Sequence, residues 1–243
     1  MLFFISIKQA DLINRLTMLM NKEDILSCVE IEPKQPAEIS IIWLHGLGAD
    51  GHDFAPIAPE LTALTQLNIR FIFPHAPVMP ITINNGHEMR AWFDIYAFSP
   101  NAKIDSDGIA QSAIRIEQLI EREVTRGIAT HNIFIAGFSQ GAAIALTTGI
   151  CYPKPLAGII ALSGYLPEAS SILSKANSVN RHIPIFLAHG TKDPILPFAL
   201  GEATYASLTE AGYPVAFHSY NMPHSVCNEE VRDIAAWLNK NKR

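Results

Sequence analysis

The chain has 243 residues, of which 49% are hydrophobic and 17% are charged, and this size and composition suit a single α/β domain. The formal net charge of −5 and the isoelectric point near 6.0 provide no basic surface for nucleic acid or for an anionic membrane, so we expect neither as a partner. The cysteines Cys28, Cys151 and Cys227 are widely spaced and include no C-x-x-C pair. This pattern excludes a disulfide framework and predicts a reducing, cytoplasmic location.

The first residues show no recognisable targeting signal. Segment 1–7 is apolar but short, Lys8 follows it rather than precedes it, and no small-residue cleavage site comes next. We therefore expect no signal peptide. No apolar run reaches the length of about 18 residues that a transmembrane helix needs, so we also expect no membrane span. Met18 and Met20 are alternative starts, and residues 1–20 are predicted to be an N-terminal extension of a single domain at 21–243.

Short apolar runs alternate with helical patterns along the rest of the chain. The predicted strands are 26–32, 39–44, 68–73, 132–136, 156–162, 184–189 and 215–220. The predicted helices are 109–126, 142–151, 198–211 and 225–240, and the acidic residues at 105–107 suit the start of the first of them. This alternation predicts a mostly parallel sheet with helices on both faces, with the first strand as an antiparallel edge strand.

The stretch 74–104 does not follow this alternation. It contains four prolines and the turn sequence Asn84-Asn85-Gly86. A loop of this length inside a compact domain usually has a function. Because bulky side chains gather at 90–94, we predict an ordered loop over the functional site.

The most informative motif is Gly137-Phe138-Ser139-Gln140-Gly141, which lies between a predicted strand and a predicted helix. In this setting a G-x-S-x-G segment forms a nucleophile elbow, a strained turn that exposes the serine hydroxyl. The glycines let the strand and the helix approach closely, and the N–H groups at the start of the helix face the reacting group. Ser139 is therefore the predicted nucleophile.

A serine nucleophile needs a histidine base, and the histidine needs an acid that orients it. In an open parallel sheet such groups follow the carboxyl ends of the strands. Asp193 is the first acid after the sixth predicted strand, and His224 lies in the turn after the last strand. The order Ser139, Asp193, His224 is that expected of an α/β-hydrolase.

Each of these two partners has a rival. Glu168 is the other acid near a strand end between Ser139 and His224, and His218 lies inside the last predicted strand. Alternation along a strand assigns His218 to one face of the sheet, where a structural role is expected. Placement in turns therefore favours Asp193 and His224.

Acyl transfer also needs two N–H donors for the oxyanion. One is expected from Gln140, directly after the nucleophile, and the other from the glycine-rich loop 45–51, where we assign Leu47. The side chains of Leu47 and Gln140 are expected to be secondary to these N–H groups.

The loop 45–51 also matches the G-x-G-x-x-G spacing of dinucleotide sites. However, no acid ends the next strand, and Pro56 and Pro59 lie where an unbroken helix would begin. We therefore reject a dinucleotide site.

No cofactor and no metal ion are expected. None of the nine histidines is paired as H-x-H or H-E-x-x-H, and His45 and His189 each precede a glycine at a strand end, where structural hydrogen bonding is expected. Trp92 and Phe93 fit the core and a pocket wall equally well. We assign the substrate pocket to these two residues and Leu196.

Five segments resemble those of the phospholipase/carboxylesterase family, which includes bacterial carboxylesterases and acyl-protein thioesterases. They are LHGLGAD (44–50), MRAWFD (89–94), GFSQG (137–141), HGTKDP (189–194) and MPH (222–224), and they occur in the family's order. The resemblance covers about residues 26–239. It implies a small α/β-hydrolase fold without a large lid domain, often dimeric. It also implies Ser139, Asp193 and His224 as the triad and Leu47 and Gln140 as the oxyanion donors.

The resemblance implies short- to medium-chain acyl esters, some thioesters or lysophospholipids as substrates. Ala142 departs from the family, which commonly has a second glycine there, but a methyl group at the start of a helix is tolerable and activity is expected. Loop 81–88 varies most within the family and shapes its acyl pocket. We therefore expect a serine carboxylesterase that forms an acyl-enzyme. An acyl-protein thioesterase or lysophospholipase is the alternative, and a catalytically idle binding protein is a third hypothesis.

Overall fold

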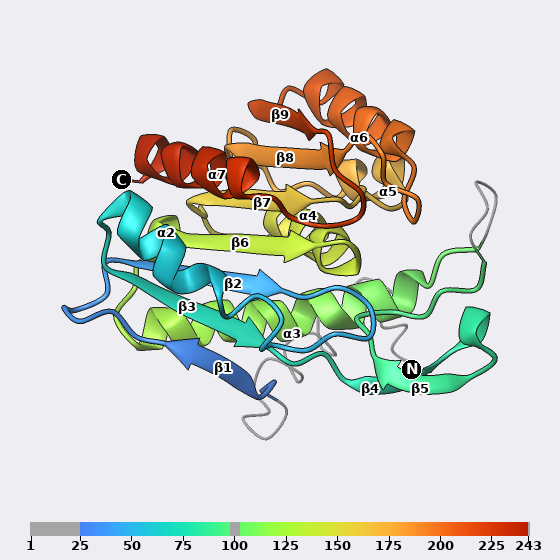
Figure 1. Cartoon of the computed structure of the whole chain (residues 1–243), viewed down its shortest axis with the longest axis horizontal. Helices are drawn as coiled ribbons and strands as arrows, with labels where there is room; N and C mark the ends of the chain where they lie inside the picture. Colours follow the sequence, from blue (N-terminus) through green and yellow to red (C-terminus); the bar gives the residue numbers. More distant parts are fainter. Residues whose placement is uncertain (1–24, 98–102, 243) are drawn as a thin grey trace, which may run out of the picture.

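The computed structural model describes residues 25–97 and 103–242, so the predicted extension at 1–20 and part of the long loop lie outside the described residues. A seven-stranded sheet with the order β1-β3-β2-β6-β7-β8-β9 runs through the molecule. β1 pairs antiparallel with β3, and the other neighbouring pairs are parallel (Figure 1). The strands are β1 (Cys28–Ile31), β2 (Ile39–Leu44), β3 (Ile69–Pro74), β6 (Ile133–Phe138), β7 (Gly158–Leu162), β8 (Ile185–Gly190) and β9 (Val215–Tyr220). The predicted mostly parallel sheet and its antiparallel edge strand are confirmed.

Helices cover both faces of this sheet. In Figure 1, α2 and α7 lie in front of it, and α3 and α4 lie behind it. The helices are α2 (Ile57–Thr65), α3 (Ser106–Thr125), α4 (Gln140–Cys151), α5 (Ala169–Ser174), α6 (Phe198–Glu210) and α7 (Asn228–Asn241), with 3-10 turns η3 (Thr130–Asn132) and η4 (Ser178–Asn180). Within the described ranges, none of the helices combines the length and the apolar character needed to cross a bilayer.

The sheet separates two hydrophobic cores, as the pattern of β2 shows. Ile39, Ile41 and Trp43 pack with buried residues of α2 and α7, whereas Ile42 and Leu44 pack with buried residues of α3 and α4. Successive side chains of a strand point to opposite faces, so a parallel strand that is covered on both faces is apolar throughout. This is why the near-continuous apolar runs in the sequence predicted these strands correctly.

Two parts of the structure differ from the expectation. The helix α2 forms even though Pro56 and Pro59 argued against an unbroken helix, because Pro56 is its N-cap and Pro59 lies in its first turn, where an N–H has no intrahelical acceptor. The predicted long loop contains a small antiparallel hairpin of β4 (Val78–Ile81) and β5 (His87–Arg90), with the 3-10 turn η2 (Thr82–Asn84) between them.

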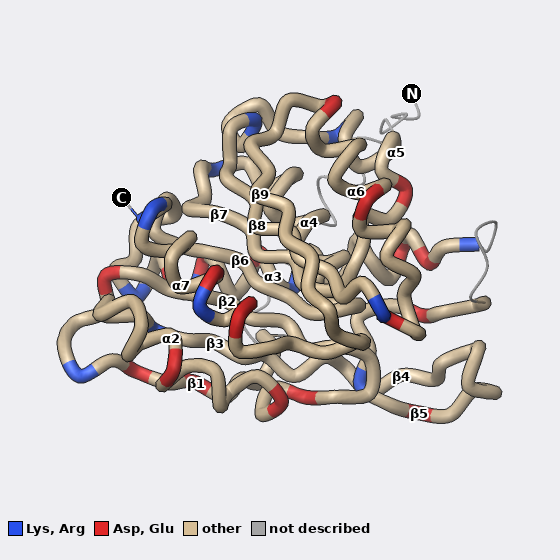
Figure 2. Tube along the Cα trace, turned by 45° about the horizontal axis from the view of Figure 1, so that its top comes forward, with Lys and Arg blue, Asp and Glu red and all other residues tan. Residues whose placement is uncertain are grey.

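Charged residues of both signs are interspersed along the chain trace (Figure 2). One acid, Glu123 of α3, is fully buried and joins α3 to the edge of the sheet. Arg70 and Arg126 donate hydrogen bonds to its carboxylate at 3.0 and 2.8 Å, and the Ser40 hydroxyl donates a third at 3.1 Å. Arg126 also binds Glu30 of β1 at 2.7 Å. A buried carboxylate needs such partners, and these fasten β1 to α3.

A second buried acid, Glu230 in the first turn of α7, lacks such partners. Its side chain is inaccessible to solvent, and its carboxylate oxygens have no well-formed hydrogen bond with a described residue, although the backbone N–H of Cys227 lies near them. Burial raises the pKa of Glu230 to about 8, with the Cys227 N–H acting in the opposite direction and the charge of Asp233 adding to the rise. The folded protein therefore holds this carboxyl in its protonated form at neutral pH.

We predict that Glu230→Gln stabilises the protein above about pH 5 and removes a pH dependence of the wild type. The folded-state pKa of about 8 lies above the ordinary value of 4.5, so the unfolded chain loses this proton first as the pH rises. Stability is therefore full below pH 4.5 and falls between the two pKa values, by up to about 1.4 kcal/mol per pH unit.

Urea unfolding at a series of pH values measures this effect. The exposed neighbour Glu229 provides the control, because Glu229→Gln should leave the pH dependence unchanged. The prediction is contradicted if the unfolding free energies of the wild type and of Glu230→Gln change with pH in the same way.

Candidate active site

Ser139 lies in a strained turn between the last residue of β6 and the first residue of α4. Its φ of 56° and ψ of −118° are rarely adopted by a residue other than glycine. A β-carbon at Gly137 would overlap the carbonyl of Gly141, and one at Gly141 would overlap the carbonyl of Leu44 in β2. The two glycines therefore let α4 pack closely against β6 and β2, with Ser139 at the turn, as a nucleophile elbow requires.

Asp193 and His224 meet at the same edge of the sheet, after β8 and β9. His224 Nδ1 lies 2.6 Å from Asp193 Oδ2, and the N–H groups of Ile195 and Leu196 donate to Asp193 Oδ1 at 2.8 and 2.9 Å. Burial would raise the pKa of Asp193, but the hydrogen bonds from His224, Leu196 and Ile195 outweigh it and hold the pKa below its usual value. The buried His189, with Nε2 at 2.9 Å from the Leu196 carbonyl, is structural, as expected.

The structure brings Ser139, His224, Leu47 and Gln140 to one cavity of about 330 Å³. These are the predicted nucleophile, the predicted base and the two predicted oxyanion residues. Gln140 is the first residue of α4, so its N–H has no acceptor one turn earlier in the helix. Asp53 also lines this cavity, and its pKa is raised by burial and then by the charge of Asp50.

A second, larger cavity of about 470 Å³ adjoins the first. The two share the lining residues Phe93, Ile95, Ala97, Tyr165, Ile195 and Leu196. Ile104 and Leu200 extend the apolar wall of the larger cavity, which Ser139 does not line. The site therefore consists of a chamber beside Ser139 and an apolar extension that leads away from it, and apolar side chains form most of the lining of both.

The loop 45–51, which contains Leu47, is fastened to the segment after β3 and to the end of the hairpin. Ala76 N donates to His45 Nε2 at 3.1 Å, the Trp92 indole N–H donates to the His45 carbonyl at 2.8 Å, and Gly48 N donates to the Arg90 carbonyl at 2.8 Å. Burial lowers the pKa of His45 to about 4, so its ring is neutral and serves this structural role. The loop is thus held in place beside Ser139 by partners outside it.

The side chain of Gln140 has a function that the sequence did not indicate. Its Oε1 accepts a hydrogen bond from Trp92 N at 2.8 Å, and its Nε2 donates to the Phe93 carbonyl at 2.6 Å. Both bonds are buried, and they attach the wall of the cavity to the helix that follows the nucleophile. These bonds give the side chain a structural role, and its expected secondary part in stabilising the oxyanion stays a prediction.

Trp92 lies in the hydrophobic core and does not line either cavity, unlike Phe93 and Leu196. Its indole N–H and its backbone N–H are both used inside the protein, by His45 and Gln140. The assignment of Trp92 to the pocket wall is corrected, because its polar groups hold it inward.

The two rival residues lie elsewhere. Glu168 accepts a hydrogen bond from the Ser106 hydroxyl at 2.6 Å, and His218 stacks on Phe186 with ring centroids 4.6 Å apart and its Nδ1 3.5 Å from Asp233. Neither residue lines either cavity. The geometry therefore favours Asp193 and His224, as their placement in turns did.

Comparisons with known proteins agree with this architecture. A family model described as phospholipase/carboxylesterase matches residues 27–242. Acyl-protein thioesterase 1 of Yarrowia lipolytica is 39% identical over 218 residues, which cover 88% of this chain and 96% of the relative. The crystal structure of Arabidopsis thaliana SOBER1, a carboxylesterase, superimposes with a TM-score of 0.80 at 36% identity and covers 84% of this chain and 99% of SOBER1. Zea mays acyl-protein thioesterase 2 gives a TM-score of 0.79 at 31% identity, covering 88% of this chain and 98% of that protein.

These matches identify the chain as a small α/β-hydrolase, and its described residues form no large lid. It belongs to the phospholipase/carboxylesterase family and is a hydrolase.

We predict that Gln140→Leu destabilises the protein while an equivalent change on the surface does not. The substitution leaves the Trp92 N–H and the Phe93 carbonyl buried without partners, and each unpaired group costs roughly 1–3 kcal/mol. Urea unfolding of Gln140→Leu and of Gln111→Leu, whose glutamine is exposed on α3, measures the difference. Equal unfolding free energies of the two variants would show that the bridge has no structural role.

Proposed function

We propose that the chain is a serine carboxylesterase whose catalytic triad is Ser139, His224 and Asp193. The main support is the 2.6 Å contact between His224 Nδ1 and Asp193 Oδ2 at a cavity that Ser139 also lines. With Nδ1 bound to an ionised carboxylate, the histidine keeps Nε2 as the nitrogen that takes the serine proton. The positive φ of Ser139 supports its role, because backbone strain of this kind is typical of a nucleophile elbow.

The reaction proceeds through an acyl-enzyme. The Ser139 hydroxyl attacks the ester carbonyl while His224 accepts its proton, and the N–H groups of Gln140 and Leu47 stabilise the oxyanion. His224 then protonates the leaving alcohol. A water molecule, activated by the same histidine, attacks the acyl-enzyme and releases the acid. Asp193 remains ionised and stabilises the imidazolium at both stages.

The apolar extension of the site suits the acyl chain of the substrate. Phe93, Ile195 and Leu196 line both cavities, so an acyl chain whose carbonyl carbon is bonded to Ser139 Oγ passes along one continuous apolar wall. We infer short- to medium-chain acyl esters as substrates. Water is displaced from this wall when the chain binds, which supplies affinity without further polar contacts.

A second candidate is hydrolysis of thioesters, such as S-acylated protein. The similarity to proteins named acyl-protein thioesterase supports it, and ester and thioester carbonyls need the same triad and oxyanion donors. Lysophospholipids are a third substrate class with the same acyl bond. The close pairing of Asp193 with His224 argues against a catalytically idle binding protein.

We predict that Ser139→Ala lowers the turnover of a short nitrophenyl ester by several orders of magnitude and abolishes labelling by a fluorophosphonate. The fold should persist, because the substitution removes a single oxygen atom. Ser170→Ala, at an exposed position of α5, should behave like the wild type in both assays. Turnover of Ser139→Ala close to that of the wild type would refute the assignment of the nucleophile.

We also predict that Ala199→Trp lowers turnover of long-chain esters and spares short ones. Ala199 is exposed on α6 and lines only the larger cavity, so an indole there shortens the acyl site without touching Ser139. Ala206→Trp, at another exposed position of the same helix, is the matched control. A series of nitrophenyl esters and matching thioesters measures both effects. An equal loss at every chain length would contradict this location of the acyl chain, and higher turnover of the thioesters would favour the second candidate function.

A further inference from the structure

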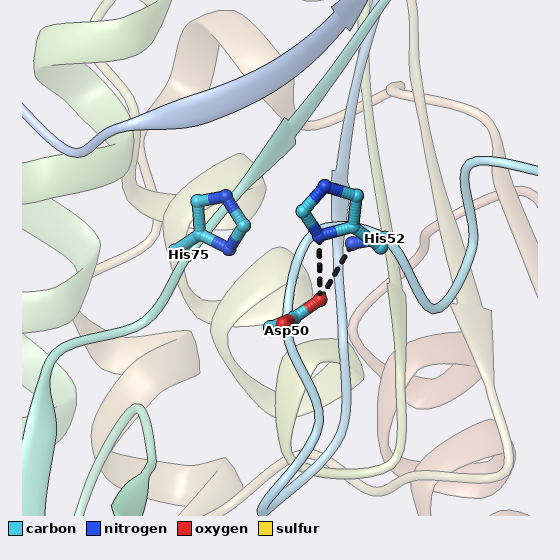
Figure 3. Close-up of side chains that lie close together, drawn as sticks. All are labelled: Asp50, His52 and His75. Atoms are coloured by element: carbon cyan, nitrogen blue, oxygen red, sulfur yellow. Dashed lines mark hydrogen bonds and ion pairs between the residues drawn. The ribbon is translucent and has the colours of Figure 1, made fainter.

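Three side chains that prefer metal ions gather beside the active site, although no spacing in the sequence indicated this. Asp50, His52 and His75 form this cluster (Figure 3). Asp50 and His52 lie in the turn after β2, and His75 directly follows β3. These strands are parallel neighbours, so their carboxyl ends bring the three side chains to the same edge of the sheet.

The ligand atoms of the cluster are close to the spacing of a metal site. One atom from each residue lies within 4.8 Å of the other two, and His52 Nδ1 is 3.1 Å from Asp50 Oδ1. Oxygen and nitrogen ligands lie about 2.0–2.2 Å from zinc, and so roughly 3.4 Å from each other in a tetrahedral site. The ligand atoms must approach one another by up to about 1.4 Å, which side-chain rotation allows because the His52 side chain is 72% exposed and that of Asp50 is 44% exposed.

The hydrogen bonds of the cluster also suit a cation. The backbone N–H of His52 donates to Asp50 Oδ1 at 2.8 Å and so orients this carboxylate toward the two imidazoles. Carboxylate oxygen and imidazole nitrogen are both ligands that zinc accepts.

The donor set selects the kind of ion. Calcium and magnesium prefer oxygen ligands, whereas two imidazoles with one carboxylate suit zinc and neighbouring transition metals. We propose that Asp50, His52 and His75 bind one divalent transition metal ion of the zinc type, with water at the remaining positions, and that the bound ion inhibits the enzyme.

Inhibition follows from how the loop 45–51 is fastened. Gly51 N donates to His75 Nδ1 at 3.1 Å, and Ala76 N donates to His45 Nε2 at 3.1 Å, so both ends of the loop are fixed to two successive residues. A metal ion at His75 Nδ1 takes the lone pair that Gly51 uses. A metal ion at Nε2 places the proton on Nδ1, facing the same N–H. Either mode removes the Gly51 bond and loosens the loop that contains Leu47.

The effect on turnover rests on the proposed function, whereas zinc binding does not. Binding is tested first, by titration calorimetry of the full chain without a polyhistidine tag, using zinc chloride in a non-chelating buffer. We expect one zinc ion per chain, and an affinity at least about 10-fold lower in His52→Ala and in Asp50→Asn. His131→Ala, an exposed histidine remote in sequence from the cluster, should bind zinc like the wild type. Equal affinities of wild type and His52→Ala, or no binding by the wild type, would overturn the site.

Inhibition is then tested with a short nitrophenyl ester. Zinc should lower turnover of the wild type, a chelator should restore it, and His52→Ala should keep its basal turnover in the presence of zinc. Zinc binding without loss of turnover would overturn the inhibitory step. If the enzyme is inactive toward every ester, the proposed function is refuted, but the calorimetric test of the metal site remains valid.

Discussion

The close packing of helix α4 against the ends of β2 and β6 determines where the rest of the site can lie. It requires glycine at 137 and 141, because a β-carbon at either position would overlap a backbone carbonyl. The same contact holds Ser139 at a positive φ and places the loop after β2 next to it, since β2 and β6 are neighbouring strands. Ala142 fits this packing because the residue that faces its methyl group, Gly164, has no side chain.

A second set of contacts makes the nucleophile turn, the oxyanion loop and the cavity wall a single hydrogen-bonded unit. Gln140 bonds to the backbone of residues 92 and 93, and the Trp92 indole bonds to the His45 carbonyl. The polar groups in this unit are satisfied by one another rather than by solvent. In such a network each partner is buried, so removing one leaves another unpaired in a place that water cannot reach. The relative positions of the groups proposed for catalysis are therefore set before a substrate arrives.

The parts of the fold that the sequence predicted are those determined locally. Strands covered on both faces have a distinctive apolar pattern, and turn placement selected Asp193 and His224, which the structure brings within hydrogen-bonding distance. The inward position of Trp92 and the bridging role of Gln140 depend on contacts between segments almost fifty residues apart, which no local pattern reports. The neighbours of His75 likewise come from the loop after another strand, β2. Helix α2 was not predicted because Pro56 and Pro59 were taken as helix breakers, although proline is tolerated at the start of a helix.

The ion pairs at the edge of the sheet affect how the protein meets other chains. Among the described strands, β1 is the outermost on its side and is only four residues long, and its Glu30 is bound by Arg122 of α3 and by Arg126 directly after this helix. An outermost strand presents unpaired N–H and C=O groups to which a strand of another molecule can add. An added strand would have to lie against these paired charges and exclude water from them, which is unfavourable. The contacts that fasten β1 to the body of the protein therefore also protect this end of the sheet from aggregation.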